Sequence, residues 1–173
     1  MKLSDMLSID VVEADLKAKD KNGVIEELVD LLIKTEKITQ RDKVIAAVLA
    51  REDMMTTGIG HGVAIPHAKS DKVNNIDETF NKSMQGIDMD NPIIVVAFGR
   101  SVQGIEFGAA DGVPVHLFFL LIASGEGSSL HIKALARISR LLKHHYIREL
   151  LKKAKDAESM LEILKTEEAK RLE

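Results

Sequence analysis

Two uninterrupted apolar segments constrain the fold of this 173-residue chain more than any other feature. The first covers residues 93–98 and the second covers residues 113–122. A strand with one solvent-exposed face alternates apolar and polar residues, whereas a continuous apolar run indicates a strand that is covered on both faces. The two segments therefore predict a sheet with helices packed against both of its sides.

The segments before and after these strands carry apolar residues at helical spacing. Asp20 is placed to cap a helix whose apolar stripe holds Val24, Ile25, Leu28, Val29, Leu32 and Ile33. Residues 39–42 resemble a capping box with Asp in place of Glu or Gln, and they predict a second helix that buries Val44, Ile45, Val48 and Leu49. Further helices are expected from about residue 130, over residues 146–154, and from residue 156 onward.

The remaining segments complete the expected order of elements. Residues 11–19 predict a first strand, residues 71–92 an irregular connection, residues 100–112 a turn-rich excursion and residues 124–129 a loop. Strands with helices on both sides in the sequence favour an α/β fold. We therefore expect a single α/β domain over residues 1–173, with a mixed β-sheet flanked by helices on both faces.

Composition excludes several classes of function. A formal net charge of −3 and an aromatic content of 3% argue against nucleic acid as a partner. The N-terminal residues contain no apolar signal core, and the longest apolar run is too short to span a bilayer, so we expect no membrane insertion. The chain has no cysteine, which fits a reducing compartment. These features together predict a cytoplasmic protein.

The stretch over residues 56–68 holds the strongest candidate for chemistry. Glycine recurs at alternate positions up to Gly62, and glycine lets a ligand or another backbone approach closely. Pro66 fixes its own φ and keeps the preceding residue extended. This pattern predicts a short strand over residues 63–65 that stops at Pro66 and places His67 at a rigid edge. His67 could then act as a nucleophile, a general base or a metal ligand, or it could be a loop histidine without a role.

Two further residues have a functional and a structural interpretation each. His131 lies in the first turn of an expected helix, where free backbone N–H groups favour an anion; it could donate to a phosphate or simply face water. Arg51 ends the second expected helix, where it could hold a phosphate or only complement the helix dipole.

The other histidines have simpler interpretations. His61 lies between two glycines; it could neighbour His67, but it is expected to be an exposed loop residue. His116 is expected to be a hydrogen-bonded structural residue in a strand. His144 and His145 fit a capping role at the end of a helix. The sequence lacks the HExxH, GxSxG and GK[ST] patterns, so it offers no motif of a zinc protease, a serine hydrolase or a nucleotide-binding loop. A metal-dependent hydrolase that uses several histidines is kept as a weaker alternative.

The residues from Gly58 to Ala68, read as GIGHGVAIPHA, closely resemble the active-site signature of one protein family. This family comprises the fructose/mannitol-type IIA components of the phosphoenolpyruvate-dependent sugar phosphotransferase system, and it includes the nitrogen-regulatory IIA proteins. The sequences ARE at residues 50–52, DGVPV at residues 111–115 and LHIKALAR at residues 130–137 agree with the family as well. The resemblance covers about residues 3–165.

The resemblance implies that His67 is the phosphorylated nucleophile, with His131 and Arg51 as its partners in the active site. It places Gly60, His61 and Gly62 in a phosphate-binding loop. The implied donor is the phosphohistidine of the carrier HPr and the implied acceptor is a IIB domain, and neither step needs a cofactor or a metal. Two features depart from the family: His61 stands where Asn is frequent, and the segment over residues 73–92 is longer than usual. Both sugar transport and a regulatory role fit this resemblance.

Overall fold

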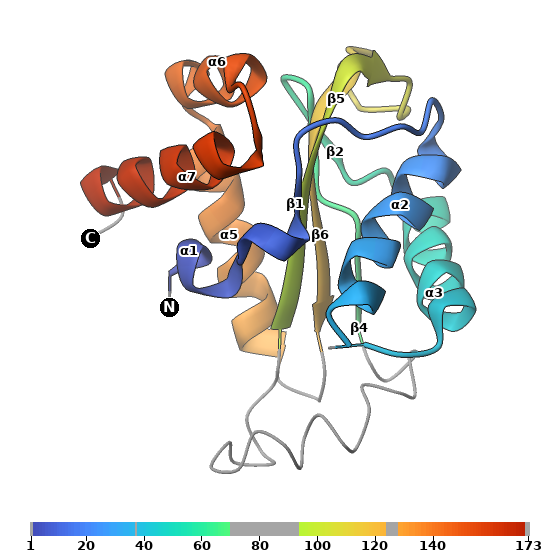
Figure 1. Ribbon diagram of the computed structural model, residues 1–173. Coiled ribbons are helices and arrows are strands. Elements are labelled where there is room, and N and C mark those ends of the chain that lie inside the picture. The colour runs from blue at the N-terminus through green and yellow to red at the C-terminus, as the bar shows by residue number, and fades with distance from the viewer. Residues whose placement is uncertain (1, 37, 70–93, 124–127, 172–173) are drawn as a thin grey trace, which may run out of the picture.

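A six-stranded mixed sheet lies between two layers of helices in the computed structural model (Figure 1). The structure describes residues 2–36, 38–69, 94–123 and 128–171. The spatial order of the strands is β1 (Val12–Glu13), β5 (Ile94–Ile105), β6 (Val115–Ala123), β3 (Val63–Ala64) and β2 (Gly58–Gly60). Strand β4 (His67–Lys69) also pairs with β6. The α/β fold with a mixed sheet is therefore confirmed.

Two long antiparallel strands, β5 and β6, form the centre of the sheet. Almost every residue of β6 is buried, and the rings of Phe98 and Phe119 stack with their centroids 4.2 Å apart. Strands β1, β3 and β4 run parallel to their neighbours in this central pair. The continuous apolar sequence of the two strands follows from this position, because both of their faces are covered.

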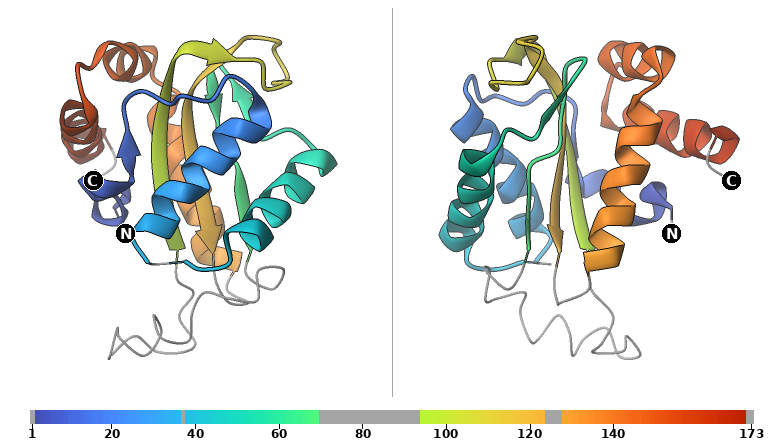
Figure 2. Two further views of the ribbon diagram at one scale, coloured as in Figure 1. Left: turned by 45° about the vertical axis from the view of Figure 1, so that its right-hand side comes forward. Right: turned by 180° about the vertical axis from the view of Figure 1, so that it is seen from behind.

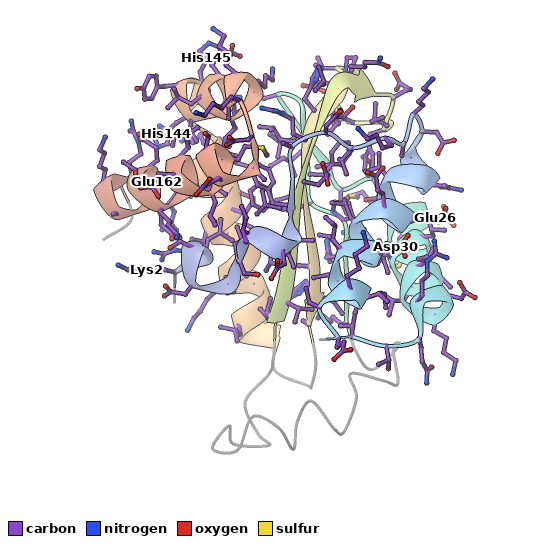
Figure 3. The ribbon with its side chains drawn as sticks, viewed as in Figure 1. Lys2, Glu26, Asp30, His144, His145 and Glu162 are labelled. Atoms are coloured by element: carbon purple, nitrogen blue, oxygen red, sulfur yellow. The ribbon has the colours of Figure 1, made fainter. Side chains whose placement is uncertain are left out.

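One face of the sheet is covered by α2 (Lys21–Lys34) and α3 (Arg41–Met54). The other face is covered by α5 (Ser128–Leu142), α6 (His145–Lys153) and α7 (Ala157–Arg171), with the short α1 (Leu3–Met6) beside them (Figure 2). Polar side chains lie on the outer sides of these layers: Glu26 and Asp30 project from α2, and Glu162 from α7 (Figure 3). The amphipathic patterns in the sequence therefore predicted α2, α3, α5, α6 and α7, whereas the short α1 was not predicted.

The N-terminal segment is held to the last helix by a buried carboxylate. Glu168 accepts hydrogen bonds from the backbone N–H groups of Leu3 and Ser4, at 2.7 and 3.0 Å, and from Arg137 Nε at 2.7 Å. This contact joins α1, α5 and α7 on the face of the sheet away from α2 and α3.

Several boundaries differ from those that the sequence predicted. Strand β1 is confined to two residues, because the carboxylate of Glu13 accepts the N–H of Asp15 and the chain bends there. Strand β5 continues to Ile105, well into the predicted excursion, since Ile105 still pairs with Val115 across a register shift. The predicted connection over residues 71–92 lies outside the described residues.

The helix starts follow the prediction at one position and depart from it at another. Asp20 caps α2, and its Oδ1 accepts the N–H of Gly23 at 2.7 Å. The predicted capping box before α3 is wrong: Gln40 occupies the N-cap with φ 59°, and its side chain makes no cap bond. A residue in that left-handed conformation turns the chain sharply, so the helix begins one position later at Arg41.

His144 and His145 also differ from their predicted role. His144 is the N-cap of α6 and His145 is its first residue, so neither ends a helix (Figure 3). Only residues 143 and 144 separate α5 from α6, and sequence periodicity does not resolve such a short break.

Candidate functional site

His67 begins strand β4 directly after Pro66. Its Nδ1 lies 2.8 Å from the carbonyl oxygen of Ile65. A carbonyl oxygen only accepts, so Nδ1 carries the proton and Nε2 keeps its lone pair. The backbone is fixed on the other side as well, because the Leu121 N–H donates to Pro66 O at 3.0 Å. The ring is thus held in one tautomer with Nε2 available as a nucleophile.

The predicted rigid edge at Pro66 has a more specific form in the structure. Strand β3 ends at Ala64, the chain passes Ile65 and Pro66, and β4 resumes the pairing with β6 at His67. The sequence predicted that His67 lies just beyond the end of a strand. In the structure His67 is instead the first residue of a second short strand.

His131 lies next to His67 although 64 positions separate the two residues in the sequence. It comes from the first turn of α5, and the two ring centroids are 5.0 Å apart at an interplanar angle of 58°. The residue is only 3% exposed, and its Nδ1 has no hydrogen-bond partner in the described part of the chain. A buried imidazole with an unpaired nitrogen is costly unless a ligand or water completes it, which is typical of a binding site.

Both imidazoles favour the neutral form. Burial lowers the pKa of His67, and the positive charges of Arg51 and Lys69 lower it further, against the opposing effect of the bond to Ile65 O. Burial also lowers the pKa of His131 to about 4, with the neighbouring charges of His67, Lys69 and Arg51 acting in the same direction. At neutral pH, His67 therefore keeps the lone pair that a nucleophile needs.

Arg51 is in the last turn of α3, and its Nη1 donates to Met55 O at 2.8 Å. It shares with both histidines a pocket of about 420 Å³, whose lining residues are Ala47, Ala50, Arg51, Met54, His67, Ala68, Lys69 and His131. These lining residues include two cationic side chains and no carboxylate. A pocket with fixed positive charge and neutral imidazoles is suited to bind an anion such as a phosphoryl group.

The loop of Gly60, His61 and Gly62 lies elsewhere in the structure. All three residues have positive φ, at 96°, 58° and 79°; Gly60 ends β2, and His61 and Gly62 form the turn to β3. Gly62 O accepts from the His116 N–H at 2.9 Å, whereas His67 pairs with Leu121, about 16 Å farther along β6 at strand spacing. None of the three lines the pocket. The phosphate-binding role of this loop stays a prediction.

Asp111 holds that loop. Its carboxylate accepts the N–H of His61 at 2.8 Å and the N–H of Val113 at 3.1 Å, and these two bonds lower its pKa. The DGVPV segment at residues 111–115 thus supports the turn that precedes β3, away from His67.

Sequence reasoning missed Lys69 and Met54, which line the pocket. Lys69 stands two residues after His67 on β4, and alternate residues of a strand share one side, so this position carried a signal. Met54 stands three residues after Arg51 on α3, and such positions share a helix face. Lys69 was not predicted because the sequence alone did not show that a strand follows Pro66.

The described residues offer no group of three or more histidine, aspartate or glutamate side chains that could together hold a metal ion. Within the same described ranges, no helix combines the length and the apolar character that crossing a bilayer requires.

Comparison with known proteins gives one consistent family. Residues 5–167 match the family described as "Phosphoenolpyruvate-dependent sugar phosphotransferase system, EIIA 2". The chain is 34% identical over 164 residues to the fructose-specific EIIABC component of Bacillus subtilis, covering 95% of this chain but only 23% of that protein. It is 32% identical over 166 residues to a nitrogen regulatory protein of Bradyrhizobium diazoefficiens, covering 95% of each.

The fold is similar to that of solved structures from the same group. The nitrogen regulatory protein IIA-Ntr of Neisseria meningitidis superposes with a TM-score of 0.75 at 26% sequence identity. The match covers 94% of this chain and 98% of that one, so the two folds correspond along almost their entire length.

Proposed function

Because the chain belongs to the EIIA type 2 family of the phosphoenolpyruvate-dependent sugar phosphotransferase system, we propose that His67 accepts a phosphoryl group from phospho-HPr and passes it to a IIB domain. The arrangement of His67 supports this proposal. Its Nδ1–H donates to Ile65 O, so Nε2 of the neutral ring keeps its lone pair, and the ring lines a pocket with two cationic side chains. The protein would work in the cytoplasm, alternating between its two protein partners.

The transfer balances without a cofactor. The Nε2 lone pair of His67 forms the new N–P bond as the bond to the donor's ring nitrogen breaks, and that electron pair returns to the donor imidazole. The proton on Nδ1 stays in place, and Ile65 O stabilises the positive charge that the phosphorylated ring acquires. Phosphoryl transfer relies mainly on positioning and on stabilisation of charge, so the protein does not need to move a proton.

Arg51 and His131 would bind the oxygens of the phosphoryl group. Arg51 brings a permanent positive charge to the pocket, and neutral His131 donates through a ring N–H. His131 is buried beside the His67 ring, so it is already in place before the donor arrives. Lys69 adds a second positive charge at the rim of the pocket.

A regulatory role is the second candidate. The chain is about equally similar to a fructose-specific component, at 34% identity, and to a nitrogen regulatory protein, at 32%. Sugar transport, with fructose, mannitol or a related sugar, is the leading interpretation. In the alternative, the phosphorylation state of His67 controls the binding of other proteins. Transfer of the phosphoryl group to a cognate IIB domain, measured with purified components, distinguishes the two roles.

The test of the phosphocarrier function is intact-mass analysis after incubation with enzyme I, HPr and phosphoenolpyruvate. We expect one added phosphoryl group that depends on HPr, is lost in acid and is absent from His67→Ala. Uptake of phosphate by the His67→Ala variant would contradict the assignment of the site. No uptake by the wild-type protein with active cognate HPr would contradict the carrier function itself.

A further inference from the structure

Glu52 follows Arg51 directly in α3, yet it faces away from the pocket and the proposed reaction does not use it. Consecutive residues of a helix point about 100° apart, so a neighbour of a pocket residue can point into the core. Glu52 is only 4% exposed, which is unusual for a charged residue. A buried carboxylate is costly unless it is fully paired, so its partners indicate what it does.

The partners of Glu52 come from two other segments. Lys21 Nζ in α2 lies 2.8 Å from Oε2. The backbone N–H of Thr57 donates to the same carboxylate at 3.1 and 3.2 Å, and the Thr57 hydroxyl donates to Oε1. Glu52 therefore fixes the chain where it leaves α3, immediately before β2.

Thr57 connects this carboxylate to the nucleophile. The Thr57 carbonyl oxygen accepts the N–H of Ile65 at 3.0 Å. The carbonyl of the same Ile65 accepts Nδ1 of His67 at 2.8 Å, which sets the tautomer of the ring. A continuous series of hydrogen bonds thus leads from Glu52 through Thr57 and Ile65 to His67.

The same carboxylate also closes the turn that orients Arg51. The turn runs between Glu52 and Thr57, and its Met55 carbonyl accepts Arg51 Nη1 at 2.8 Å. Met54 and Met55 are 75% and 69% exposed, so side-chain packing contributes little to holding this turn. The bonds to Thr57 close it from inside.

We propose that Glu52 is the positioning residue of the site: through Thr57 it places the Ile65 and Met55 carbonyls that orient the His67 ring and the Arg51 guanidinium. The inference rests on the proposed function for its kinetic test, but its structural test is independent of activity. Lys21 completes the arrangement by neutralising the carboxylate, and its Nζ also lies 4.6 Å from the centre of the Phe107 ring.

The test compares Glu52→Gln and Thr57→Val with a matched control, Glu168→Gln. Glu168 is also a buried glutamate with backbone and cationic partners, but it joins α1, α5 and α7 on the opposite face of the sheet. Its partner Arg137 lies six residues along α5 from His131, and the hydrogen bonds described for Glu168 go to α1 and α5 rather than to the segment that holds His67. In rapid-mixing experiments with phospho-HPr, we expect Glu52→Gln to lower kcat by about tenfold to a hundredfold, the range expected for a small misplacement of reacting groups. KM should change little, and the control should keep the wild-type kcat.

Two further measurements separate positioning from a general loss of stability. Nitrogen-15 NMR of the His67 ring should show one tautomer, protonated at Nδ1, in the wild type and in Glu168→Gln, and a mixture of tautomers in Glu52→Gln. In an Arg51→Met background, Glu52→Gln should lower kcat by a smaller factor than it does in the wild type, because part of its effect on kcat passes through Arg51. Thr57→Val removes only the hydroxyl contact with Glu52, and it is the second test variant if Glu52→Gln does not fold.

The inference is overturned if the His67 tautomer and kcat are unchanged in a folded Glu52→Gln or Thr57→Val protein. It is equally overturned if Glu168→Gln lowers kcat as much as these variants do. If the wild-type protein takes up no phosphate, the proposed function fails, and the tautomer measurement still decides whether Glu52 positions the ring.

Discussion

His67 and His116 lie on neighbouring strands and make nearly the same bond. His67 Nδ1 is 2.8 Å from Ile65 O, and His116 Nδ1 is 2.9 Å from Ser101 O. In both cases the carbonyl fixes the proton on Nδ1 and leaves Nε2 as the unprotonated nitrogen. The backbone bond therefore sets the tautomer at two positions, and His67 is the one that lines the pocket with Arg51 and His131.

The surroundings of the two rings differ. The His67 ring opens into the cationic pocket beside His131. The His116 ring packs against Gly104, where a Cβ would lie 2.9 Å from its Nε2. A nucleophile needs space and charge for the incoming group as well as the right tautomer. The two rings therefore share the tautomer that the proposed chemistry needs, and the pocket distinguishes His67 from His116 as the proposed nucleophile.

The largest expected effect comes from removing each ring in turn. His67→Gln should abolish phosphorylation because it removes the proposed nucleophile, and the second imidazole of the pocket, His131, is buried beside it at 3% exposure. His116→Gln should keep the wild-type rate, since the ring lies beside Gly104 and does not line the pocket of His67. Intact-mass analysis of both variants after incubation with phospho-HPr measures this difference. A loss of phosphorylation in a folded His116→Gln protein would break the comparison.

The next effect concerns the groups that surround His67. Arg51→Met and His131→Ala should each lower kcat/KM by about 10²–10³, the usual cost of removing one group that stabilises transition-state charge. Rapid-quench measurement with phospho-HPr gives the rate. Arg140→Met, which removes an exposed arginine from the last turn of α5, is the control and should change the rate little. An equal loss in Arg51→Met and Arg140→Met would point to the net charge of the protein instead of the pocket.

A difference in the free energy of unfolding is expected between alanine variants of Gly104, which lies beside His116, and of Gly108. Gly104 and Gly108 both have positive φ, at 85° and 69°, so alanine is strained at either position. An alanine Cβ at Gly104 would also meet the His116 ring at 2.9 Å, whereas nothing lies within 4 Å of one at Gly108. We expect Gly104→Ala to reduce the free energy of unfolding by about 1–3 kcal/mol more than Gly108→Ala. Urea denaturation measures this, and both variants should still be phosphorylated normally.

The smallest effect is a shift in pH dependence. Burial lowers the pKa of His67, with Arg51 and Lys69 acting in the same direction, so its neutral form persists below the ordinary histidine value of about 6.5. The initial rate of phosphorylation should therefore stay constant as the pH falls through that value and decline only at lower pH. Lys69→Met should move the decline to higher pH, because one of the charges that lowers the pKa is gone. A midpoint at or above that of free histidine would contradict the burial of the nucleophile.

Local sequence patterns determined much of the fold. Continuous apolar runs identified β5 and β6 as covered strands, and the capping residue and apolar stripe identified α2, because both signals involve residues close together in the chain. The family resemblance, carried by the GIGHGVAIPHA signature, is confirmed by the match over residues 5–167. His67 itself was the leading candidate because proline and glycines constrain the backbone around it.

Only the tertiary structure decided what surrounds His67. The pairing of β4 with β6 places Lys69 in the pocket, and the bond between Thr57 and Ile65 connects buried Glu52 to the nucleophile. The same pairing separates His61 from His67, although they are only six positions apart in the sequence. Such hydrogen bonds join residues at spacings that no local period encodes, whereas helix and strand formation depends on neighbours along the chain. The sequence alone therefore singled out His67 as the candidate nucleophile, and the packing of distant segments determined which charges and carbonyls surround it.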